Sequence, residues 1–420
     1  MADRVRSVLA GLAGIRTGLA DLYRDLHSHP ELSYAEVRTS AEVLRRLTAL
    51  GADLADHVGG TGVAATFRNG GGPTVLLRAD MDALPVAERT GLPYASTERG
   101  TDPDGNDVPV MHACGHDMHV TCLLGALDLL VRSREAWSGT LVAAFQPAEE
   151  VGGGAQSMVD DGLFDRFGHP DVVLGQHVAP LPAGMAGAHQ GPAFAGSDSL
   201  LVRLFGRGGH GSRPETTIDP VVMAAATVLR LQTVVSREVA GGETAVVTVG
   251  ALHAGTKDNI IPDTAELTVN VRSYTPAVRT RVLAAVERIV RAEAAASGAE
   301  RDPEITVTDS FPVLYNDPDA TERTLSALRT VLGDERVLDP GAVTGSEDFG
   351  LFPTAAGVPG CYWLFGGVDP AAFQAAEAAG TRDKDIPSNH SPFFAPLLEP
   401  TIDTGVTAMV GAALEWLGEL

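Results

Sequence analysis

Residues 140–150, TLVAAFQPAEE, join a short apolar run to a pair of glutamates. The run at 140–145 has the length and the apolar character of a buried strand. A short apolar run followed by polar residues occurs again at 74–85 (TVLLRADMDALP) and at 172–177 (VVLGQH), and a helical pattern at about 120–131 lies between runs. This alternation predicts an α/β fold, with a central mixed sheet flanked by helices.

A different rhythm begins near Ser199. Apolar periodicity there predicts strand, helix, strand, strand, helix and strand, at 200–205, 220–235, 245–251, 265–272, 277–296 and 304–308. This order is typical of a ferredoxin-like α+β domain. We therefore predict that residues 194–311 form an insert, and that residues 1–193 and 312–420 together form the first domain.

The composition limits the classes of function. The chain has 420 residues, 31 of them Lys or Arg and 54 Asp or Glu, which gives a net charge of −23. Such a charge repels nucleic acids and anionic lipids, and no apolar run reaches the roughly 18 residues of a membrane helix, so we expect neither partner. The three cysteines, Cys114, Cys122 and Cys361, cannot form a disulfide framework, which favours the cytoplasm.

The densest group of reactive side chains is MHACGHDMH, residues 111–119. Its polar members are His112, Cys114, His116, Asp117 and His119. Thiolate and imidazole suit zinc and its transition-metal neighbours, and two ligands two residues apart on a loop can reach one ion. The cluster therefore predicts a metal site. The alternatives are a polar loop with ordinary capping residues, or Cys114 as a nucleophile paired with a histidine.

Acidic partners follow the predicted strands. Ligands of α/β sheets collect at the carboxyl ends of strands, where Glu149 and Glu150 stand in QPAEE. Because adjacent side chains diverge, one carboxylate can bind a metal while its neighbour takes a proton from water. Asp80, Asp82 and His177 follow the other two runs. A solvated acidic turn is the alternative for QPAEE.

Two motifs near the end of the chain add further candidates. TGSEDF (344–349) contributes Glu347 and Asp348, and SNHSPFF (388–394) contributes His390. His390 is either a distant metal ligand or a buried, hydrogen-bonded histidine. The early segment HSHPELSYAE (27–36) is interpreted as a helix boundary, where the histidines end one helix and Glu36 begins the next.

These motifs resemble the dinuclear metallopeptidases and amidohydrolases that include aminoacylase, carboxypeptidase G, hippurate hydrolase and plant auxin-conjugate hydrolases. HSHPELSYAE, ADMDALP, MHACGHDMH, QPAEE, GGHGSRP, DNIIPD, TGSEDFG and NHSPFF occur in the order of the hippurate-hydrolase-like branch and span nearly the whole chain. The resemblance implies two divalent metal ions (Zn, Mn, Co or Ni), with Glu149 as the general base and with the ligands Cys114, His116, Glu150, His177 and His390. Other branches use a bridging aspartate in the region where this chain offers Cys114.

The resemblance also implies that the insert is a lid that forms a dimer interface. His210, in GRGGHGSRP, would reach the active site of a partner chain and support the oxyanion. Asn259, in DNIIPD, and Arg272, in VNVRSY, would contact substrate. Arg272 would bind the carboxylate of the substrate. Without the resemblance, these residues are interpreted as a glycine-loop histidine, a turn asparagine and an exposed strand arginine.

The implied activity is hydrolysis of an N-acyl or N-aroyl amino acid, or of a short peptide, by a homodimer. Two other classes remain as alternatives. A thiol-dependent hydrolase would use Cys114 as its nucleophile. A non-catalytic protein would bind a metal or a ligand without turnover, but it would have no need for an unligated glutamate beside Glu150.

Overall fold

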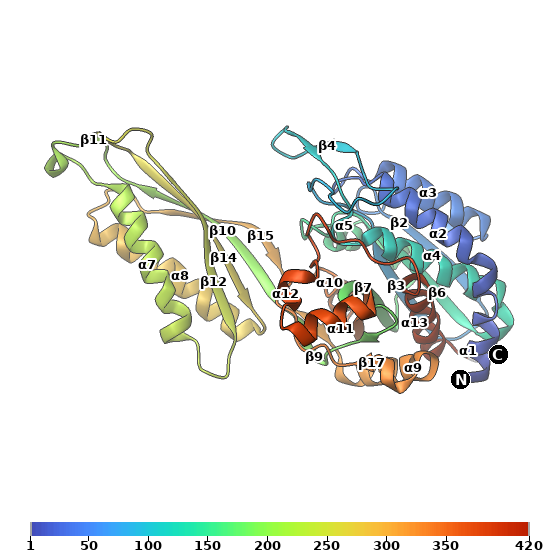
Figure 1. The fold of residues 1–420 in the computed structure, drawn as a ribbon. Helices are drawn as coiled ribbons and strands as arrows, with labels where there is room; N and C mark the ends of the chain where they lie inside the picture. Colours follow the sequence, from blue (N-terminus) through green and yellow to red (C-terminus); the bar gives the residue numbers. More distant parts are fainter. Residues whose placement is uncertain (1, 419–420) are drawn as a thin grey trace. The chain divides into compact units, whose positions relative to one another are not determined.

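The structure is a computed structural model that describes residues 2–418 (Figure 1). The chain forms two compact units. The first unit comprises residues 2–193, 315–341 and 348–418, and the second comprises Phe194–Leu314 together with Ala342–Glu347. Within residues 2–418, no helix is both long and apolar enough to cross a membrane.

The first unit is built on an eight-stranded mixed sheet with the order β1-β2-β6-β3-β7-β18-β8-β17. Strand β3 pairs in parallel with β6 and β7, and β7 pairs in parallel with β18, whereas β1, β2 and β6 pair antiparallel. The strands are β1 Asp53–Ala55, β2 Val63–Asn69, β3 Thr74–Asp80, β6 Gly139–Gln146, β7 Val172–Pro182, β8 Ala186–Gly187, β17 Val337–Leu338 and β18 Gly360–Val368. A separate hairpin pairs β4 Arg99–Thr101 with β5 Asp107–Pro109.

Helices cover both faces of this sheet. Val75 and Leu77 of β3 belong to the main core, and Leu76 is equally buried on the opposite face, because strand side chains alternate. The helices of the main core are α1 Ala2–Leu9, α2 Leu12–Ser28, α3 Val37–Ala49, α4 His116–Arg132, α9 Pro318–Leu332 and α13 Thr401–Trp416. The opposite face carries α5 Gly154–Asp160, α6 Leu163–Phe167 and α10 Leu351–Ala356, and α11 Pro370–Ala379 and α12 Arg382–Asp385 follow β18.

The second unit packs two helices on a four-stranded antiparallel sheet of order β12-β14-β10-β15. Its elements are β10 Gly196–Phe205, α7 Pro220–Glu238, β12 Ala245–Ala254, β14 Thr264–Ser273, α8 Pro276–Ala296 and β15 Glu304–Phe311. Both helices begin with a proline behind a capping side chain: Asp219 accepts from Val221 N, and Thr275 from Val278 N. A small ribbon pairs β11 Gly209–His210 with β13 Ile260–Ile261. The chain leaves the first unit through β9 Gly191–Phe194 and returns through β16 Leu314–Asn316.

The predicted fold class is confirmed, since the first unit has a central mixed sheet flanked by helices. Three details differ from the sequence prediction. The helical spacing of apolar residues from Val5 to Leu26 predicts one helix, whereas the structure has two, interrupted at Ala10 and Gly11, because glycine stabilises a helix poorly. The strand predicted at 172–174 continues to Pro182 because β18 accompanies it as a parallel partner. Strand β2 and the buried helix α13 were not predicted.

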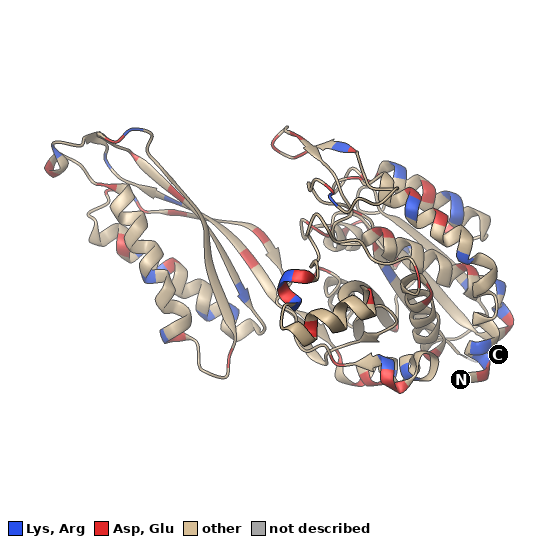
Figure 2. Cartoon of the chain, viewed as in Figure 1, with Lys and Arg blue, Asp and Glu red and all other residues tan. Residues whose placement is uncertain are grey.

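Charged residues of both signs lie mixed over the helices (Figure 2). Many exposed arginines are paired with nearby acids, such as Arg45 with Glu42 on α3 and Arg288 with Glu238 between α8 and α7. Pairs of this kind contribute little stability individually. In the view of Figure 2, the basic residues therefore do not form a continuous stripe.

Candidate functional site

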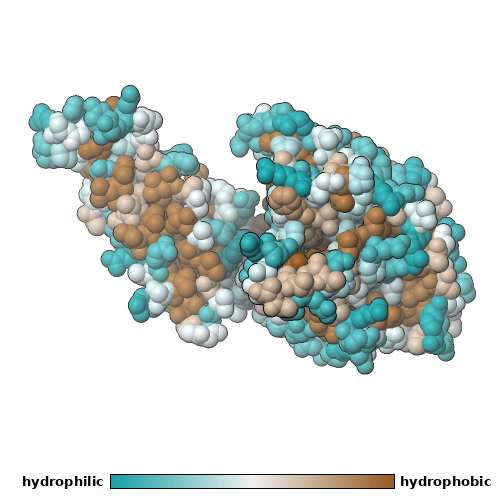
Figure 3. Space-filling view, in the orientation of Figure 1, coloured by the Kyte–Doolittle hydropathy of each residue, from teal (hydrophilic) through white to brown (hydrophobic). Residues whose placement is uncertain are grey.

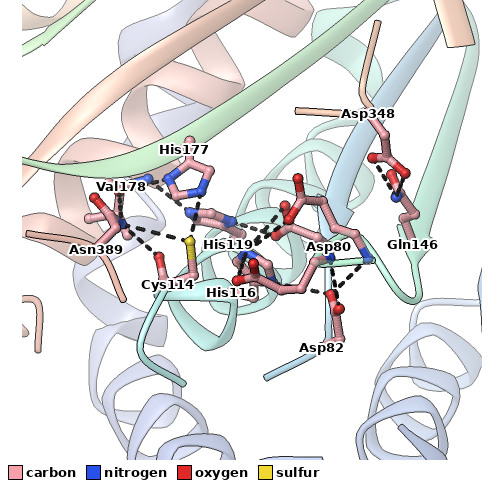
Figure 4. A network of polar contacts seen from close by, with 12 residues as sticks. Asp80, Asp82, Cys114, His116, His119, Gln146, His177, Val178, Asp348 and Asn389 are labelled. Carbon is pink, nitrogen blue, oxygen red and sulfur yellow. Dashed lines mark hydrogen bonds and ion pairs between the residues drawn. The ribbon is translucent and has the colours of Figure 1, made fainter. Parts of the chain in front are cut away.

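The five side chains predicted as metal ligands lie together in the first unit. Figure 4 shows Cys114, His116 and His177 among them. Cys114 and His116 stand at the start of α4, Glu150 follows β6, His177 lies in β7 and His390 lies in the loop before α13. Cys114 Sγ is 3.4 Å from His177 Nε2, and His390 Nε2 is 3.3 Å from Glu150 Oε2. The donor atoms form overlapping groups, each within 4.8 Å: Cys114, His116 and His177; Cys114, Glu150 and His390; His116, Glu149 and Glu150.

The sequence pattern predicts that His177 follows the end of a strand, but His177 lies inside strand β7. The pairing of Arg78 with Gly175 sets the register between β3 and β7. Two residues further along, His177 is level with Asp80, the last residue of β3. The histidine therefore still lies at the carboxyl end of the neighbouring strand, where the sheet brings the polar residues together.

Backbone contacts tie the ligand loops to one another. The Asn389 side-chain amide donates to the carbonyls of Cys114 (3.0 Å) and Val178 (3.2 Å), and His390 N donates to Ala113 O (2.8 Å). Gly115, between two candidate ligands, has φ 87°, and a Cβ there would lie 2.4 Å from Val178 Cγ1. Only glycine fits this position without strain in the backbone and a shift of the Val178 side chain.

Asp82 holds the pair of glutamates. Its two oxygens accept from Glu149 N and Glu150 N, both at 3.0 Å. Its Oδ1 also lies 3.3 Å from His116 Nδ1, and its Oδ2 accepts from the Ser33 hydroxyl at 2.7 Å. Burial opposes ionisation of Asp82, but the adjacent His116 imidazole keeps the pKa of this carboxyl below its usual value. Asp82 therefore orients His116 and leaves its Nε2 free to face Glu150, as partners of metal-binding histidines do.

A second buried network uses His119 and Asp80. His119 Nδ1 lies 2.5 Å from Asp80 Oδ1, and His119 Nε2 accepts from Val178 N at 2.8 Å. Arg78 donates to Asp80 and to Asp348, the acid noted in TGSEDF. Both ring nitrogens of His119 therefore have hydrogen-bond partners within the protein. Asp348 accepts a hydrogen bond from the buried Arg78. Glu347 belongs to the second unit.

The residues present fit divalent metal ions. His116 Nε2 and Glu150 Oε1 are buried without a hydrogen-bond partner among residues 2–418, which is rare unless an ion or a water is bound. Burial raises the pKa of Glu150 to about 8, and burial together with the charges of Glu150 and Glu149 raises the pKa of the Cys114 thiol. A cation would reverse both effects, since it stabilises carboxylate and thiolate. Thiolate, imidazole and carboxylate are together the donor set of zinc and its neighbours.

The segment HSHPELSYAE is more than a helix boundary. His27 is buried with Nδ1 2.6 Å from Asp117 Oδ2 and Nε2 3.2 Å from Glu88 Oε1. Glu36 is fully buried and accepts from Ala148 N at 2.8 Å. The sequence pattern alone indicated neither of these contacts. The available signal was that His27 follows Tyr23 by four positions and so lies on the apolar face of α2.

The predicted residues of the second unit lie in two places. His210 is exposed on β11, with its Nδ1 2.8 Å from the Ser212 hydroxyl, and Asn259 lies beside it because its carbonyl accepts from Gly211 N. Arg272 is the penultimate residue of β14, far along that strand from the ribbon of β11 and β13. It donates to Thr344 O (2.7 Å) and to the Ser346 hydroxyl (3.2 Å).

Comparison with known proteins finds relatives over most of the chain. Thermostable carboxypeptidase 1 of Saccharolobus solfataricus is 36% identical over 369 residues, which are 87% of this chain and 89% of the relative. Hippurate hydrolase of Campylobacter jejuni is 36% identical over 332 residues, which are 78% of this chain and 82% of the relative.

A similar architecture occurs in the YXEP protein of Bacillus subtilis, a dinuclear metal binding peptidase from the M20 family. Its crystal structure has a TM-score of 0.76 and 28% sequence identity, and the match covers 97% of this chain and 100% of that one. The family model of peptidase family M20/M25/M40 matches residues 76–392, a range that includes every candidate ligand. The chain belongs to peptidase family M20/M25/M40.

Proposed function

We propose that the protein is a metal-dependent amidohydrolase that cleaves N-acyl or N-aroyl amino acids, or short peptides, to a carboxylate and a free amino acid. The observation that carries the proposal is the pair of glutamates on one turn. Asp82 holds both of their N–H groups, while Glu150 Oε2 lies 3.3 Å from His390 Nε2. The names of the relatives, carboxypeptidase and hippurate hydrolase, also describe the cleavage of an amide next to an amino acid.

Five residues would hold two divalent ions, Zn, Mn, Co or Ni: Cys114, His116, Glu150, His177 and His390. When bound, such ions polarise an amide carbonyl and lower the pKa of water toward neutrality. Glu149 accepts the proton of the attacking water and returns it to the leaving nitrogen. Substrate enters past His390, whose side chain is 55% exposed, whereas the side chains of His116 and Glu150 are almost completely buried.

The second unit would complete the site as a lid in a homodimer. In this proposal, His210 of one chain donates to the oxyanion in the site of the other chain. Asn259 and Arg272 contact the substrate, and Arg272 binds the carboxylate of the substrate. Support comes from the surface of this unit, where apolar side chains gather around α7 and β12 (Figure 3). Its exposed large apolar residues are Val221, Val222, Leu229, Val235, Val246, Leu252, Ile260 and Val307. A concentration of this kind is typical of a protein interface.

A thiol-dependent hydrolase is the second candidate, because Cys114 Sγ lies only 3.4 Å from His177 Nε2. A nucleophilic cysteine needs a lowered pKa, whereas burial and the nearby glutamates raise the pKa of Cys114. The metal-dependent function is therefore favoured. It also agrees with the reducing cytoplasm as the compartment, since oxidation of Cys114 would remove a ligand.

The test is hydrolysis of a panel of N-acyl and N-aroyl amino acids and dipeptides by protein dialysed against a chelator and then loaded with each metal. We expect no turnover after chelation and recovery with at least one ion. Undiminished turnover in chelator would favour the thiol mechanism. Full metal binding without turnover of any substrate would favour a non-catalytic metal-binding protein.

A further inference from the structure

Glu36 is the residue before helix α3, but its side chain does not cap that helix. It stands directly before α3, where acidic side chains commonly cap the first turn, yet its carboxyl group makes no such cap. The carboxylate of Glu31 performs that role instead, accepting from Arg38 N at 2.9 Å and Thr39 N at 2.8 Å. The start of α3 therefore does not require the side chain of Glu36.

The Glu36 side chain points into the protein and contacts the turn that carries Glu149, at Ala148. Its Oε1 accepts from Ala148 N at 2.8 Å, and its Oε2 accepts from the Thr61 hydroxyl. No part of the residue is exposed, and this burial, with the charge of Asp82 nearby, raises the pKa of Glu36 to about 7. A buried carboxyl group is costly to the fold, so a structural purpose beyond filling space is expected.

Ala148 has a backbone conformation that needs support. Its φ of 50° is in the left-handed region, which is unfavourable for a residue other than glycine. It directly precedes Glu149, so the direction of the Glu149 side chain depends on this turn. The N–H groups of Ala148, Glu149 and Glu150 are all held by carboxylates, the first by Glu36 and the other two by Asp82. Ser33, three residues before Glu36, donates to Asp82.

We propose that Glu36 is a positioning residue: by accepting from Ala148 N, it fixes the left-handed turn that aims Glu149 at the substrate. The inference rests on the proposed role of Glu149 as the general base. Glu36 itself does not touch substrate. Its effect is on the geometry of the base, and small misplacements of a catalytic group lower the rate strongly.

The test compares Glu36→Ala, Glu36→Gln and the matched control Glu31→Ala at saturating metal. Glutamine can still accept from Ala148 N and donate to Thr61, so it should restore the turn. We expect Glu36→Ala to lower kcat by at least ~10-fold with little change in KM, and Glu36→Gln to stay within about threefold of wild type. Glu31→Ala removes a carboxylate from the same segment and should lower the melting temperature without lowering kcat.

A second measurement is independent of turnover. Amide hydrogen exchange of residues 146–152 in the metal-free protein should be faster in Glu36→Ala than in wild type, and unchanged in Glu31→Ala and Glu36→Gln. Equal exchange and equal kcat in Glu36→Ala and wild type would overturn the proposal, as would equal losses in both alanine variants. If wild type hydrolyses no substrate, the proposed function fails, while exchange still tests the turn. Should Glu36→Ala not fold, Glu36→Asp takes its place under the same criteria.

Discussion

At the scale of single residues, Glu149 and Glu150 differ in their surroundings although they are adjacent. The carboxylate of Glu150 lies close to Cys114, His116 and His390. The carboxylate of Glu149 lies close to His116, with its Oε2 3.9 Å from His116 Nε2. We predict that Glu149→Gln retains metal and fold but lowers kcat by at least ~100-fold, since proton transfer by a side chain is worth that much. Turnover by the metal-loaded variant and its metal content are measured together. Near-normal turnover would contradict the role of general base.

The ligand assignment predicts a different result for Cys114 and His390. Cys114→Ala or His390→Ala removes a donor atom, so each variant should bind less metal per chain after extensive dialysis. His189→Ala is the matched control, because His189 is a partly exposed histidine of the same unit that pairs with Asp339. Metal analysis of the three proteins checks the prediction. Equal metal content in all of them would place the ligands elsewhere.

His27 predicts a dependence of stability on pH. Burial opposes its protonation, but the charges and hydrogen bonds of Asp117 and Glu88 raise the pKa of His27 from 6.5 to about 10. A raised pKa in the folded state means that this stabilisation is complete below pH 6.5 and is lost as the pH rises through 10. The free energy of unfolding of wild type should therefore fall toward that of His27→Gln between pH 6.5 and 10. Denaturant unfolding of the metal-free proteins measures it, and a constant difference over this range would contradict the assigned charge.

At the scale of elements, the sequence predicted those strands and helices whose own pattern determines them. The runs at 74–77 and 140–145 lie within β3 and β6, and the helix predicted at 120–131 lies within α4. The extent of β7 depends on its partner β18, nearly two hundred residues later, which no local pattern reveals. The same reason explains why Glu36 was interpreted as a helix start: its contact with Ala148 depends on the tertiary fold.

The junction before α4 gives a prediction about an element. Gly115→Ala should lower both stability and bound metal, because the added Cβ would lie 2.4 Å from Val178 Cγ1 and displace Cys114 and His116. We expect a loss of about 2 to 3 kcal/mol of unfolding free energy. Gly51→Ala is the control, since Gly51 has a similar φ of 73° but open space around its Cβ position. Thermal unfolding and metal analysis check both variants, and equal behaviour would show that the contact with Val178 is unimportant.

In the whole molecule, the candidate ligands belong to the first unit, and α7 and β12 of the second unit have exposed apolar side chains. The first unit contains all five candidate ligands, on loops joined to a sheet buried on both faces. The second unit has a sheet covered by helices and a surface with exposed valines and leucines along α7 and β12. Such apolar surface is unfavourable in water, and burying it against a second copy would remove that cost.

If the second unit forms a dimer in which His210 serves the site of the other chain, two inactive variants should complement each other. His210→Ala and Glu149→Gln are each nearly inactive alone. In a mixed dimer, one site has both changes and the other has neither. Mixing equal amounts makes about half of the dimers mixed, so roughly a quarter of wild-type activity should return if subunits exchange and sites act independently. Activity is assayed after exchange has been verified by native mass spectrometry. No recovery would mean that His210 acts in its own chain or has no catalytic role.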